Sequence, residues 1–400
     1  MLSLSRLLTG TATAGDALRY DRHSAALPPH LLHFSEDKKP VVVWNVSRRC
    51  NLHCVHCYAG SADREYPGEL NTEEALAVID DLARFGVPVV LLSGGEPLMR
   101  QDLFVLSRHA RDAGLRVVLS TNGTLLTPEV ARTISEQGFS YVGVSLDGIG
   151  DVHDRFRGMR GAFDASMDGI RACRDAGIRV GVRFTITRRN QAELPAILRL
   201  LEDEGIPRFC MYHLAYSGRG ERIASDDLSH RETRRALDLL ADQVLDWHGR
   251  GIEKEVLTVD NHADAAYLYL RLLREQPERA PEVLRLLEWN GGNSSGQAVA
   301  CIDNVGRVHP DQFSWHLPVG NVRRKPFSAL WSDGANPLLR DLRRRRELIH
   351  GRCASCRFFS ICNGNLRVRA QSATGDLWAS DPACYLSDDE IRPVEATVTS

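Results

Sequence analysis

The sequence predicts an α/β protein in which a partial (β/α)6 barrel of the TIM type precedes a C-terminal cysteine-rich domain. Two observations predict the barrel. Short runs of β-branched residues alternate with amphipathic segments of about 10–15 residues, the pattern of strands that alternate with helices. Six such units follow one another, two short of the eight that close a TIM barrel. The third observation is that five of the ten cysteines lie in residues 297–384, beyond the repeating pattern.

The expected elements follow in order along the barrel. The strands are residues 41–46, 87–92, 116–120, 141–146, 179–186 and 209–214, and the helices are residues 72–85, 103–113, 128–137, 163–176 and 193–204. Asn71 precedes the first helix as an N-cap, and Glu73 and Glu74 place negative charge in its first turn. Each helix is followed by a glycine, as helix C-termini prefer: Gly86, Gly114, Gly138, Gly177 and Gly205. Units joined in this way form a parallel sheet with right-handed crossovers.

Changes in composition divide the chain into five parts. We expect an N-terminal extension (residues 1–39), the barrel (40–220), a helical bridge rich in Leu, Arg and Glu (221–296), the cysteine-rich domain (297–388) and a flexible tail (389–400). The net charge of −2 gives no bulk attraction to nucleic acid or to an anionic membrane. No run of 18 apolar residues predicts a membrane span, and the N-terminus lacks the apolar core of a signal peptide. We therefore expect a cytoplasmic monomer with no nucleic-acid or membrane partner.

Three cysteines follow the first expected strand with the spacing Cys-x3-Cys-x2-Cys: Cys50, Cys54 and Cys57. Three thiolates would hold three irons of a four-iron cluster and leave the fourth iron open. A zinc ion, with His53 or His56 as its fourth ligand, is the alternative. Polar motifs follow the later strands at the same edge of the sheet, where parallel α/β folds bind ligands.

This combination of motifs resembles the radical S-adenosylmethionine (radical SAM) enzymes. The resemblance implies that the open iron is chelated by SAM, and that an electron from the cluster cleaves SAM to methionine and a 5′-deoxyadenosyl radical. Gly94-Gly95-Glu96-Pro97 resembles the family motif that holds the SAM ammonium group. No catalytic residue beyond the cluster and SAM is assigned. The implied SAM contacts are Tyr58, Gly94, Gly95, Glu96, Ser120, Asn122, Ser145, Asp147 and Arg183.

A second cysteine set has the spacing Cys353-x2-Cys356-x5-Cys362 and is followed by Cys384. Four thiolates can saturate a second [4Fe-4S] cluster, which suits electron transfer or substrate placement. The arrangement resembles the auxiliary-cluster domain of the SPASM/twitch subfamily, which implies that these four cysteines hold one auxiliary cluster. Leu366 and Asp311 stand where the full SPASM pattern has further cysteines. A zinc ribbon is the alternative.

Further segments resemble the tetrapyrrole-modifying branch of the family: residues 292–296, 301–304, 308–313, 320–322, 367–370 and 381–384. The nearest resemblance is to the NirJ family of haem d1 synthesis. It implies the removal of two propionate side chains from 12,18-didecarboxysirohaem, with a flavodoxin- or ferredoxin-like electron donor. The alternatives are another enzyme of the sirohaem-dependent haem pathway, a SPASM-type peptide maturase and a non-catalytic iron–sulfur carrier.

An anionic macrocycle requires cationic anchors, and arginine pairs with carboxylates through two parallel hydrogen bonds. His213 and His309 could contact a substrate iron or transfer a proton, but no catalytic role is assigned to either. Cys301 is expected to be structural or to contact the substrate. The candidate anchors are Arg183, Arg188, Arg189, Arg219, Arg367 and Arg369.

Overall fold

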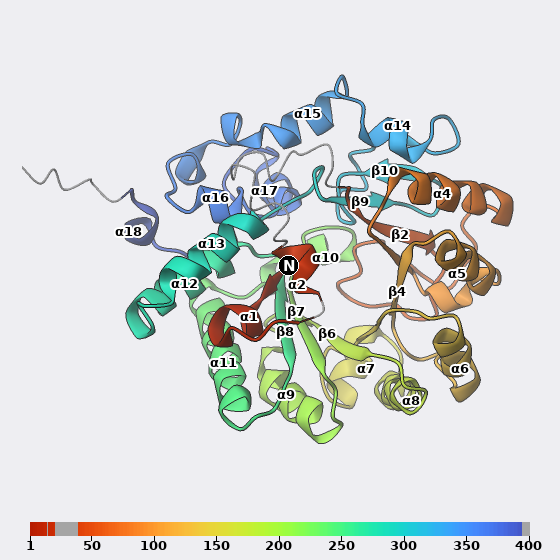
Figure 1. The fold of residues 1–400 in the computed structure, drawn as a ribbon, viewed down its shortest axis with the longest axis horizontal. Coiled ribbons are helices and arrows are strands. Elements are labelled where there is room, and N and C mark those ends of the chain that lie inside the picture. Colours follow the sequence, from red (N-terminus) through yellow and green to blue (C-terminus); the bar gives the residue numbers. More distant parts are fainter. Residues whose placement is uncertain (14, 21–38, 394–400) are drawn as a thin grey trace, which may run out of the picture. The chain divides into compact units, whose positions relative to one another are not determined.

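The computed structural model describes residues 1–13, 15–20 and 39–393 (Figure 1). These residues group into two compact units, each described by itself. The barrel unit comprises the described parts of Phe34–Asp227 and Ser295–Arg343. The helical unit comprises the described parts of Met1–His33, Leu228–Ser294 and Arg344–Ser400. Much of the expected N-terminal extension and of the expected tail therefore lies outside the described residues.

The barrel unit is built on one sheet with the strand order β7-β6-β5-β4-β3-β2-β9-β10-β11. Strands β2 to β7 pair in parallel, as predicted for successive βα units. The strands are β2 (Val41–Ser47), β3 (Val89–Gly94), β4 (Arg116–Thr121), β5 (Val142–Ser145), β6 (Val180–Ile186), β7 (Arg208–His213), β9 (Val299–Ile302), β10 (Arg307–His309) and β11 (Gly320–Asn321). The six predicted strands are confirmed to within two residues at each end.

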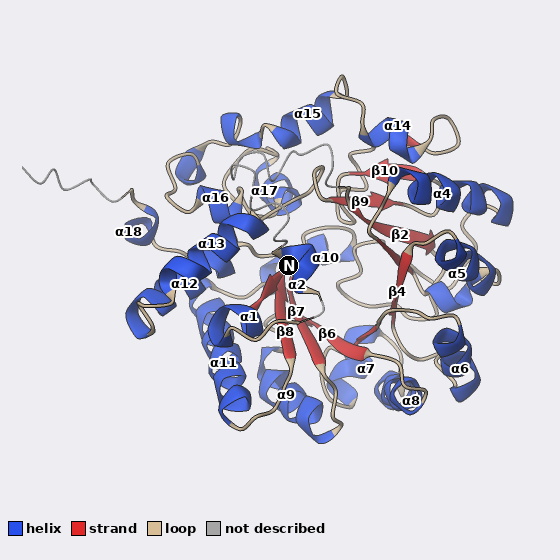
Figure 2. Ribbon diagram, viewed as in Figure 1, coloured by secondary structure: helices blue, strands red, loops and turns tan. Residues whose placement is uncertain are grey.

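The five predicted helices are also confirmed, and they lie along one side of the strands (Figure 2). They are α4 (Thr72–Phe85), α5 (Leu103–Asp112), α6 (Pro128–Glu136), α8 (Ala162–Asp175) and α9 (Leu194–Asp203). The expected cap is present as a capping box, since Asn71 and Glu74 each accept the other's backbone N–H. All five glycines that follow these helices have positive φ.

Several elements of the barrel unit were not predicted. Helix α7 (Asp151–Arg157) follows β5, and α10 (Arg219–Arg222) follows β7. Strand β9 pairs in parallel with β2, from Val41 opposite Val299 to Trp44 opposite Ile302. The remaining elements are α14 (Phe327–Trp331), α15 (Pro337–Arg343) and the short 3-10 turns Pro97–Met99, Gln191–Glu193 and Ala224–Asp226.

The helical unit joins segments from three parts of the chain. Strand β1 (Leu2–Ser3) pairs antiparallel with β8 (Glu255–Val259), and a buried Arg19–Glu255 ion pair of 2.7 Å supports the same region. Helix α1 (Leu4–Thr9) packs on α11 (His230–Gly249). The other elements are α2 (Asp16–Arg19), α12 (Ala263–Glu275), α13 (Ala280–Asn290), α16 (Phe359–Cys362), α17 (Arg367–Thr374), α18 (Asp388–Ile391) and the 3-10 turns Arg345–Glu347 and Gly351–Cys353. Among the helices described in either unit, none is both long and apolar enough to span a membrane.

Candidate functional site

The first cysteine set lies in the loop that follows β2. Cys50 and Cys54 are buried together with Leu52 and Ala162, and Cys57 lies at the edge of this cluster. Burial, reinforced by the neighbouring thiols of Cys54 and Cys57, raises the pKa of Cys50 to about 12. A metal centre bound to these sulfurs would supply the positive charge that ionises them.

Each sulfur of this set accepts an N–H group. The backbone N–H of Leu52 donates to Cys50 Sγ at 3.4 Å, and that of Ser61 donates to Cys57 Sγ at 3.4 Å. The third donor is a side chain, because Arg157 Nη1 lies 3.6 Å from Cys54 Sγ. Hydrogen bonds to cysteine sulfur are a feature of protein-bound iron–sulfur clusters. The donor set therefore fits thiolates that carry negative charge.

The Gly-Gly-Glu-Pro turn after β3 packs edge-on against the start of the cysteine loop. The N–H of Gly95 donates to Ser47 O at 2.7 Å, and the N–H of Glu96 donates to Arg49 O at 2.8 Å. A Cβ atom on Gly94 would lie less than 3.0 Å from Ser47 O, and one on Gly95 less than 3.0 Å from Arg49 O. Both positions require glycine because two stretches of backbone meet there.

The Glu96 side chain is completely buried and directed toward the end of β4. Its carboxylate accepts hydrogen bonds from the Leu98 N–H at 3.1 Å, the Thr121 hydroxyl at 2.8 Å and the Asn122 N–H at 2.8 Å. Burial raises the pKa of Glu96 to about 7. The carboxylate thus joins the turn after β3 to the end of β4, and a contact between this carboxylate and SAM stays a prediction.

Three of the expected SAM contacts lie together: Ser120 and Ser145 near the carboxyl ends of β4 and β5, and Arg183 in the middle of β6. Arg183 donates from Nη1 to the Ser120 hydroxyl, and Ser145 is directly opposite Arg183 in the β5–β6 pairing. A Cβ atom on Gly143 would lie less than 3.0 Å from the Arg183 guanidinium, so the glycine makes room for it. The prediction that polar side chains of neighbouring strands lie close together is confirmed for Ser120, Ser145 and Arg183.

Asn122 connects the end of β4 to the cysteine loop. Its Nδ2 donates to Asn51 Oδ1 at 2.9 Å and lies 3.9 Å from Cys50 Sγ. Its Oδ1 accepts from the Thr124 hydroxyl at 2.7 Å, and that hydroxyl in turn accepts from Asn51 Nδ2 at 2.8 Å. This ring of hydrogen bonds positions the loop beside Cys50.

Asp147 is fully buried, and both of its carboxylate oxygens face protein groups. Oδ1 accepts the Thr185 N–H at 2.7 Å, and Oδ2 forms an ion pair with Arg157. His56 Nε2 lies 3.7 Å from the same Oδ2. The structure therefore joins Asp147 to Arg157 and, through it, to Cys54; a contact between Asp147 and SAM stays a prediction.

An aromatic cluster lies beside the cysteine loop. The Tyr58 ring makes edge contacts with Phe313 (5.4 Å between centroids) and Trp315 (6.5 Å), and its hydroxyl donates to Asn45 Oδ1 at 2.8 Å. Arg48 lies 5.4 Å from the centre of the Trp315 ring, within reach of a cation–π contact.

Cys301 and His309, whose roles the sequence did not decide, contact residues of this region. Cys301 is fully buried and accepts a hydrogen bond from Asn45 Nδ2 at 3.3 Å. The fully buried His309 pairs with Asp303 at 3.2 Å and stacks on Trp315, with ring planes 10° apart. Both contacts tie β9 and β10 to the site.

The second cysteine set lies within the helical unit. Cys353, Cys356 and Cys362 are half-buried, and Cys384 is buried. The pKa of Cys362 is raised far above the usual value, chiefly by burial and then by the thiols of Cys384, Cys353 and Cys356. The three other thiols therefore lie close enough to Cys362 for their charge to act on it. Among the described residues, no three His, Cys, Asp or Glu side chains are arranged to hold a single metal ion.

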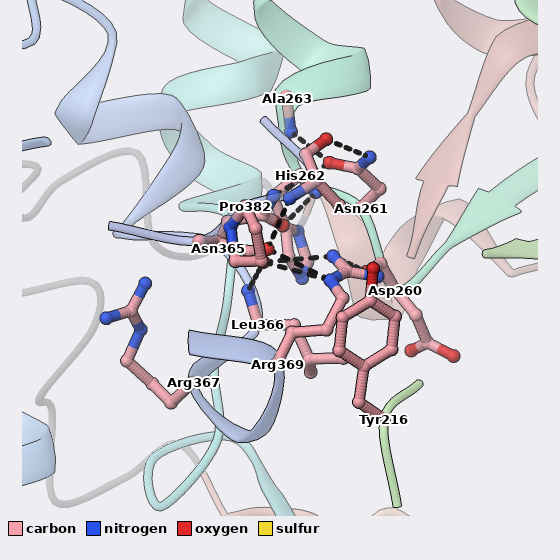
Figure 3. Close-up of polar contacts among 12 residues, drawn as sticks. Tyr216, Asp260, Asn261, His262, Ala263, Asn365, Leu366, Arg367, Arg369 and Pro382 are labelled. Atoms are coloured by element: carbon pink, nitrogen blue, oxygen red, sulfur yellow. Dashed lines mark hydrogen bonds and ion pairs between the residues drawn. The ribbon is translucent and has the colours of Figure 1, made fainter. Parts of the chain in front are cut away.

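Arg369 is held by contacts inside the helical unit (Figure 3), and Arg367 bonds to backbone carbonyls of the same unit. Arg369 is fully buried, pairs with Asp381 at 3.0 Å and donates to Asp260 O at 2.7 Å. Arg367 donates to the carbonyls of Gly364, Leu377 and Ala379. These groups occupy the Arg369 guanidinium, so the expectation that Arg369 anchors a substrate is wrong. Arg367 Nε has no hydrogen-bond partner among the described residues, and a substrate contact of Arg367 stays a prediction.

The other candidate anchors also contact protein groups. Arg189 pairs with the Asp226 carboxylate at 2.6 Å, and Arg188 donates to Ser225 O at 3.3 Å. Arg219 donates to Cys54 O and to Ser61 O, each at 2.7 Å, and so braces the cysteine loop. His213 is buried at the end of β7.

The structure adds Arg157 to the site, a residue that sequence reasoning did not select. The signal available in the sequence was Gly158, a helix C-terminal glycine that ends a short helix after the fourth strand. A short helix of this kind shows little periodicity. The contact between Arg157 and Cys54 joins residues far apart in the sequence, so only the folded structure reveals it.

We predict that Gly95→Ala destabilises the barrel unit, because the new methyl group would overlap Arg49 O. Overpacking of this kind lowers the free energy of unfolding by about 1–3 kcal/mol. Thermal unfolding and the iron retained after anaerobic reconstitution measure the effect. Gly249→Ala is the matched control, since nothing lies within 4 Å of a Cβ at that position. Equal melting temperatures and iron contents for the two variants would contradict the prediction.

Comparison with known proteins agrees with this geometry. A family model for the radical SAM superfamily matches residues 44–201. The chain is 54% identical over 399 residues to the Fe-coproporphyrin III synthase of Methanosarcina barkeri, covering 99% of this chain and 100% of that protein. It is 48% identical over 354 residues to the pre-heme d1 synthase of Dinoroseobacter shibae, covering 88% and 87%.

A solved structure shows the same fold. The crystal structure of Streptococcus suis SuiB bound to precursor peptide SuiA superposes with a TM-score of 0.70 at 18% identity, covering 91% of this chain and 79% of that one. This likeness concerns the fold alone. The matching residues 44–201 and the two relatives establish that the chain belongs to the radical SAM superfamily.

Proposed function

We propose that the chain is a radical SAM enzyme that removes side chains from a tetrapyrrole. The observation that carries the proposal is the 54% identity, over 99% of the chain, to a Fe-coproporphyrin III synthase. The second relative, a pre-heme d1 synthase, is also named for a tetrapyrrole product. Membership of the superfamily implies SAM and one four-iron cluster, for which Cys50, Cys54 and Cys57 are the proposed ligands.

When bound there, the cluster and SAM would supply a 5′-deoxyadenosyl radical. The residues of the chain would hold and shield the reacting groups. The Gly94–Glu96 turn and Arg219 fix the backbone of the cysteine loop through carbonyl contacts. Burial of Cys50 and Cys54 keeps water from the proposed cluster, which a reactive radical requires.

Two tetrapyrrole reactions fit these observations. Formation of Fe-coproporphyrin III is favoured because the relative of that name matches the chain from end to end. The haem d1 reaction, in which two propionates leave 12,18-didecarboxysirohaem, is the second candidate and is supported by the 48% identical relative. The two differ in outcome, since a coproporphyrin keeps its propionate side chains. The likeness to SuiB concerns the fold alone and adds no support for a peptide substrate.

We further propose that Cys353, Cys356, Cys362 and Cys384 hold one auxiliary [4Fe-4S] cluster. The buried Arg367 supports this. All its hydrogen bonds go to carbonyl groups, while the nearby Asp381 carboxylate is taken by Arg369. A buried cation needs anionic compensation. Burial lowers the pKa of Arg367, and the charge of Asp381, followed by that of Cys353 and Cys362, opposes this effect. An anionic cluster at this place would supply such compensation.

The electron needed for SAM cleavage would come from an external one-electron donor of the flavodoxin or ferredoxin class. We keep the proposed functional division of the chain into five parts. These are the N-terminal extension (residues 1–39), the barrel (40–220), the bridge (221–296), the auxiliary domain (297–388) and the tail (389–400). In the structure, residues 295–343 group with the barrel.

The iron content tests the cluster assignments. We expect about eight irons per chain after anaerobic reconstitution, four for each thiolate set. Replacing Cys50, Cys54 and Cys57 together by Ala should leave about four, as should replacing Cys353, Cys356, Cys362 and Cys384. Cys210→Ala is the control, because Cys210 is buried in β7 and belongs to neither set. A wild-type count of about four would remove the auxiliary cluster.

Products formed from 12,18-didecarboxysirohaem test the reaction. The reduced enzyme with SAM should form 5′-deoxyadenosine and a tetrapyrrole of lower mass, both detected by mass spectrometry. Retention of all propionates would support Fe-coproporphyrin III formation, whereas loss of two propionates would support the haem d1 reaction. Absence of 5′-deoxyadenosine would instead favour a non-catalytic iron–sulfur carrier. Formation of 5′-deoxyadenosine with an unchanged tetrapyrrole would contradict the proposed substrate.

A further inference from the structure

We propose that Arg157 raises the reduction potential of the SAM-binding cluster through a charged N–H···S hydrogen bond to Cys54, and that Asp147 opposes this effect. The inference rests on the proposed function only in that Cys50, Cys54 and Cys57 hold the cluster. It assigns a positioning and electrostatic role to a pair of residues that make no proposed contact with the substrate.

The backbone around Arg157 is fixed to the cysteine loop. Arg157 is the last residue of α7, and its carbonyl accepts the His53 N–H at 3.1 Å. The preceding carbonyl, of Phe156, accepts the Val55 N–H at 3.0 Å. Gly158 ends the helix so close to the loop that a Cβ there would lie 2.7 Å from His53 O. The helix end and the loop therefore move together, and the guanidinium keeps its distance from the sulfur.

The guanidinium lies between a sulfur and a carboxylate. Nη1 is 3.6 Å from Cys54 Sγ, and Nη2 pairs with Asp147 Oδ2. Asp147 is 0% exposed and Arg157 is 6% exposed, so water screens neither charge well. The donors to Cys50 and Cys57 are, by contrast, neutral: two backbone N–H groups and the side-chain amide of Asn122. Cys54 is thus the cysteine of this set that receives a charge-assisted bond.

Backbone and imidazole groups also contact this pair. Oδ1 of Asp147 accepts the Thr185 N–H, and the N–H of Asp147 donates to His153 Nδ1 at 3.0 Å. His56 Nε2 lies 3.7 Å from Asp147 Oδ2. Two further charges reach this region, since Arg219 acts on His56 and Glu96 interacts with Arg157. Arg157 and Asp147 are the charged pair that contacts Cys54 directly.

The expected effect follows from the charge change on reduction. Reduction transfers one electron, and no proton, from a low-potential one-electron donor to the cluster, which increases its negative charge by one. A cation bonded to a ligand sulfur stabilises the more negative state, and a nearby anion destabilises it. Removing the Arg157 charge should therefore lower the midpoint potential, and removing the Asp147 charge should raise it. If the two residues had only a structural role, their removal would not shift the midpoint potential in opposite directions.

The test is an anaerobic redox titration of the full-length reconstituted protein, with dithionite as reductant and the EPR signal of the reduced cluster as readout. SAM is left out of the titration and is added afterwards, to identify which signal it perturbs. We expect a lower midpoint potential for Arg157→Gln and a higher one for Asp147→Asn. Arg189→Gln is the matched control, because Arg189 pairs with the Asp226 carboxylate and its described contacts include no group of the cysteine loop. Its midpoint should shift less than that of either variant.

Shifts of the same sign in Arg157→Gln and Asp147→Asn would overturn the proposal, as would unchanged potentials at wild-type iron content. If Arg157→Gln retains no iron, Asp147→Asn decides, because it keeps the arginine: a raised midpoint supports the proposal and an unchanged one overturns it. Failure of the proposed function gives a different result. In that case the wild-type protein itself would lack a SAM-sensitive cluster signal or would form no 5′-deoxyadenosine.

Discussion

The contact between the Gly94–Glu96 turn and the backbone of Ser47–Arg49 is the constraint on which the candidate site depends. It fixes where the cysteine loop leaves β2, since two backbone N–H groups of the turn bind two carbonyls of the loop. The Glu96 carboxylate then extends the connection to the end of β4. Three neighbouring strands are thereby held in one arrangement beside the cysteines. Each additional contact, from Asn122, Arg157 or Arg219, acts on a loop whose position is already set.

Local sequence features predicted most of the barrel. The alternation of β-branched runs with amphipathic segments, the Asn71 cap and the glycines after the helices each act within a few residues, and all are present. Strand β9 depends instead on pairing with β2 across a long stretch of chain, which no local pattern reports. The same holds for the site. Motif spacing selected the cysteines and the strand-end polar residues, whereas the inward direction of Glu96 and the contact of Arg157 with Cys54 arise only from packing.

The arginines show how burial changes the interpretation of a charged residue. A basic residue near a strand end suggests an anchor for an anionic substrate, yet Arg367, Arg369, Arg189 and Arg219 all bind carbonyls or carboxylates of the protein. Arg157 contacts Cys54, and Arg367, besides its carbonyl bonds, is near enough to Asp381, Cys353 and Cys362 for their charge to act on it. In each unit a guanidinium therefore accompanies a cysteine set, which is consistent with two anionic centres that need buried positive charge.

The pairing of β9 with β2 also has a consequence for how the protein is made. The barrel unit is interrupted in sequence by residues 228–294, so β2 gains its second neighbour only after the ribosome has passed Ile302. Until then β2 is an edge strand with unpaired backbone groups, and such edges can pair with other chains. Long-range parallel pairing is also slow to form. The strand that leads into the cysteine loop is thus completed late in synthesis, and a nascent chain stalled before that point would expose this edge to aggregation.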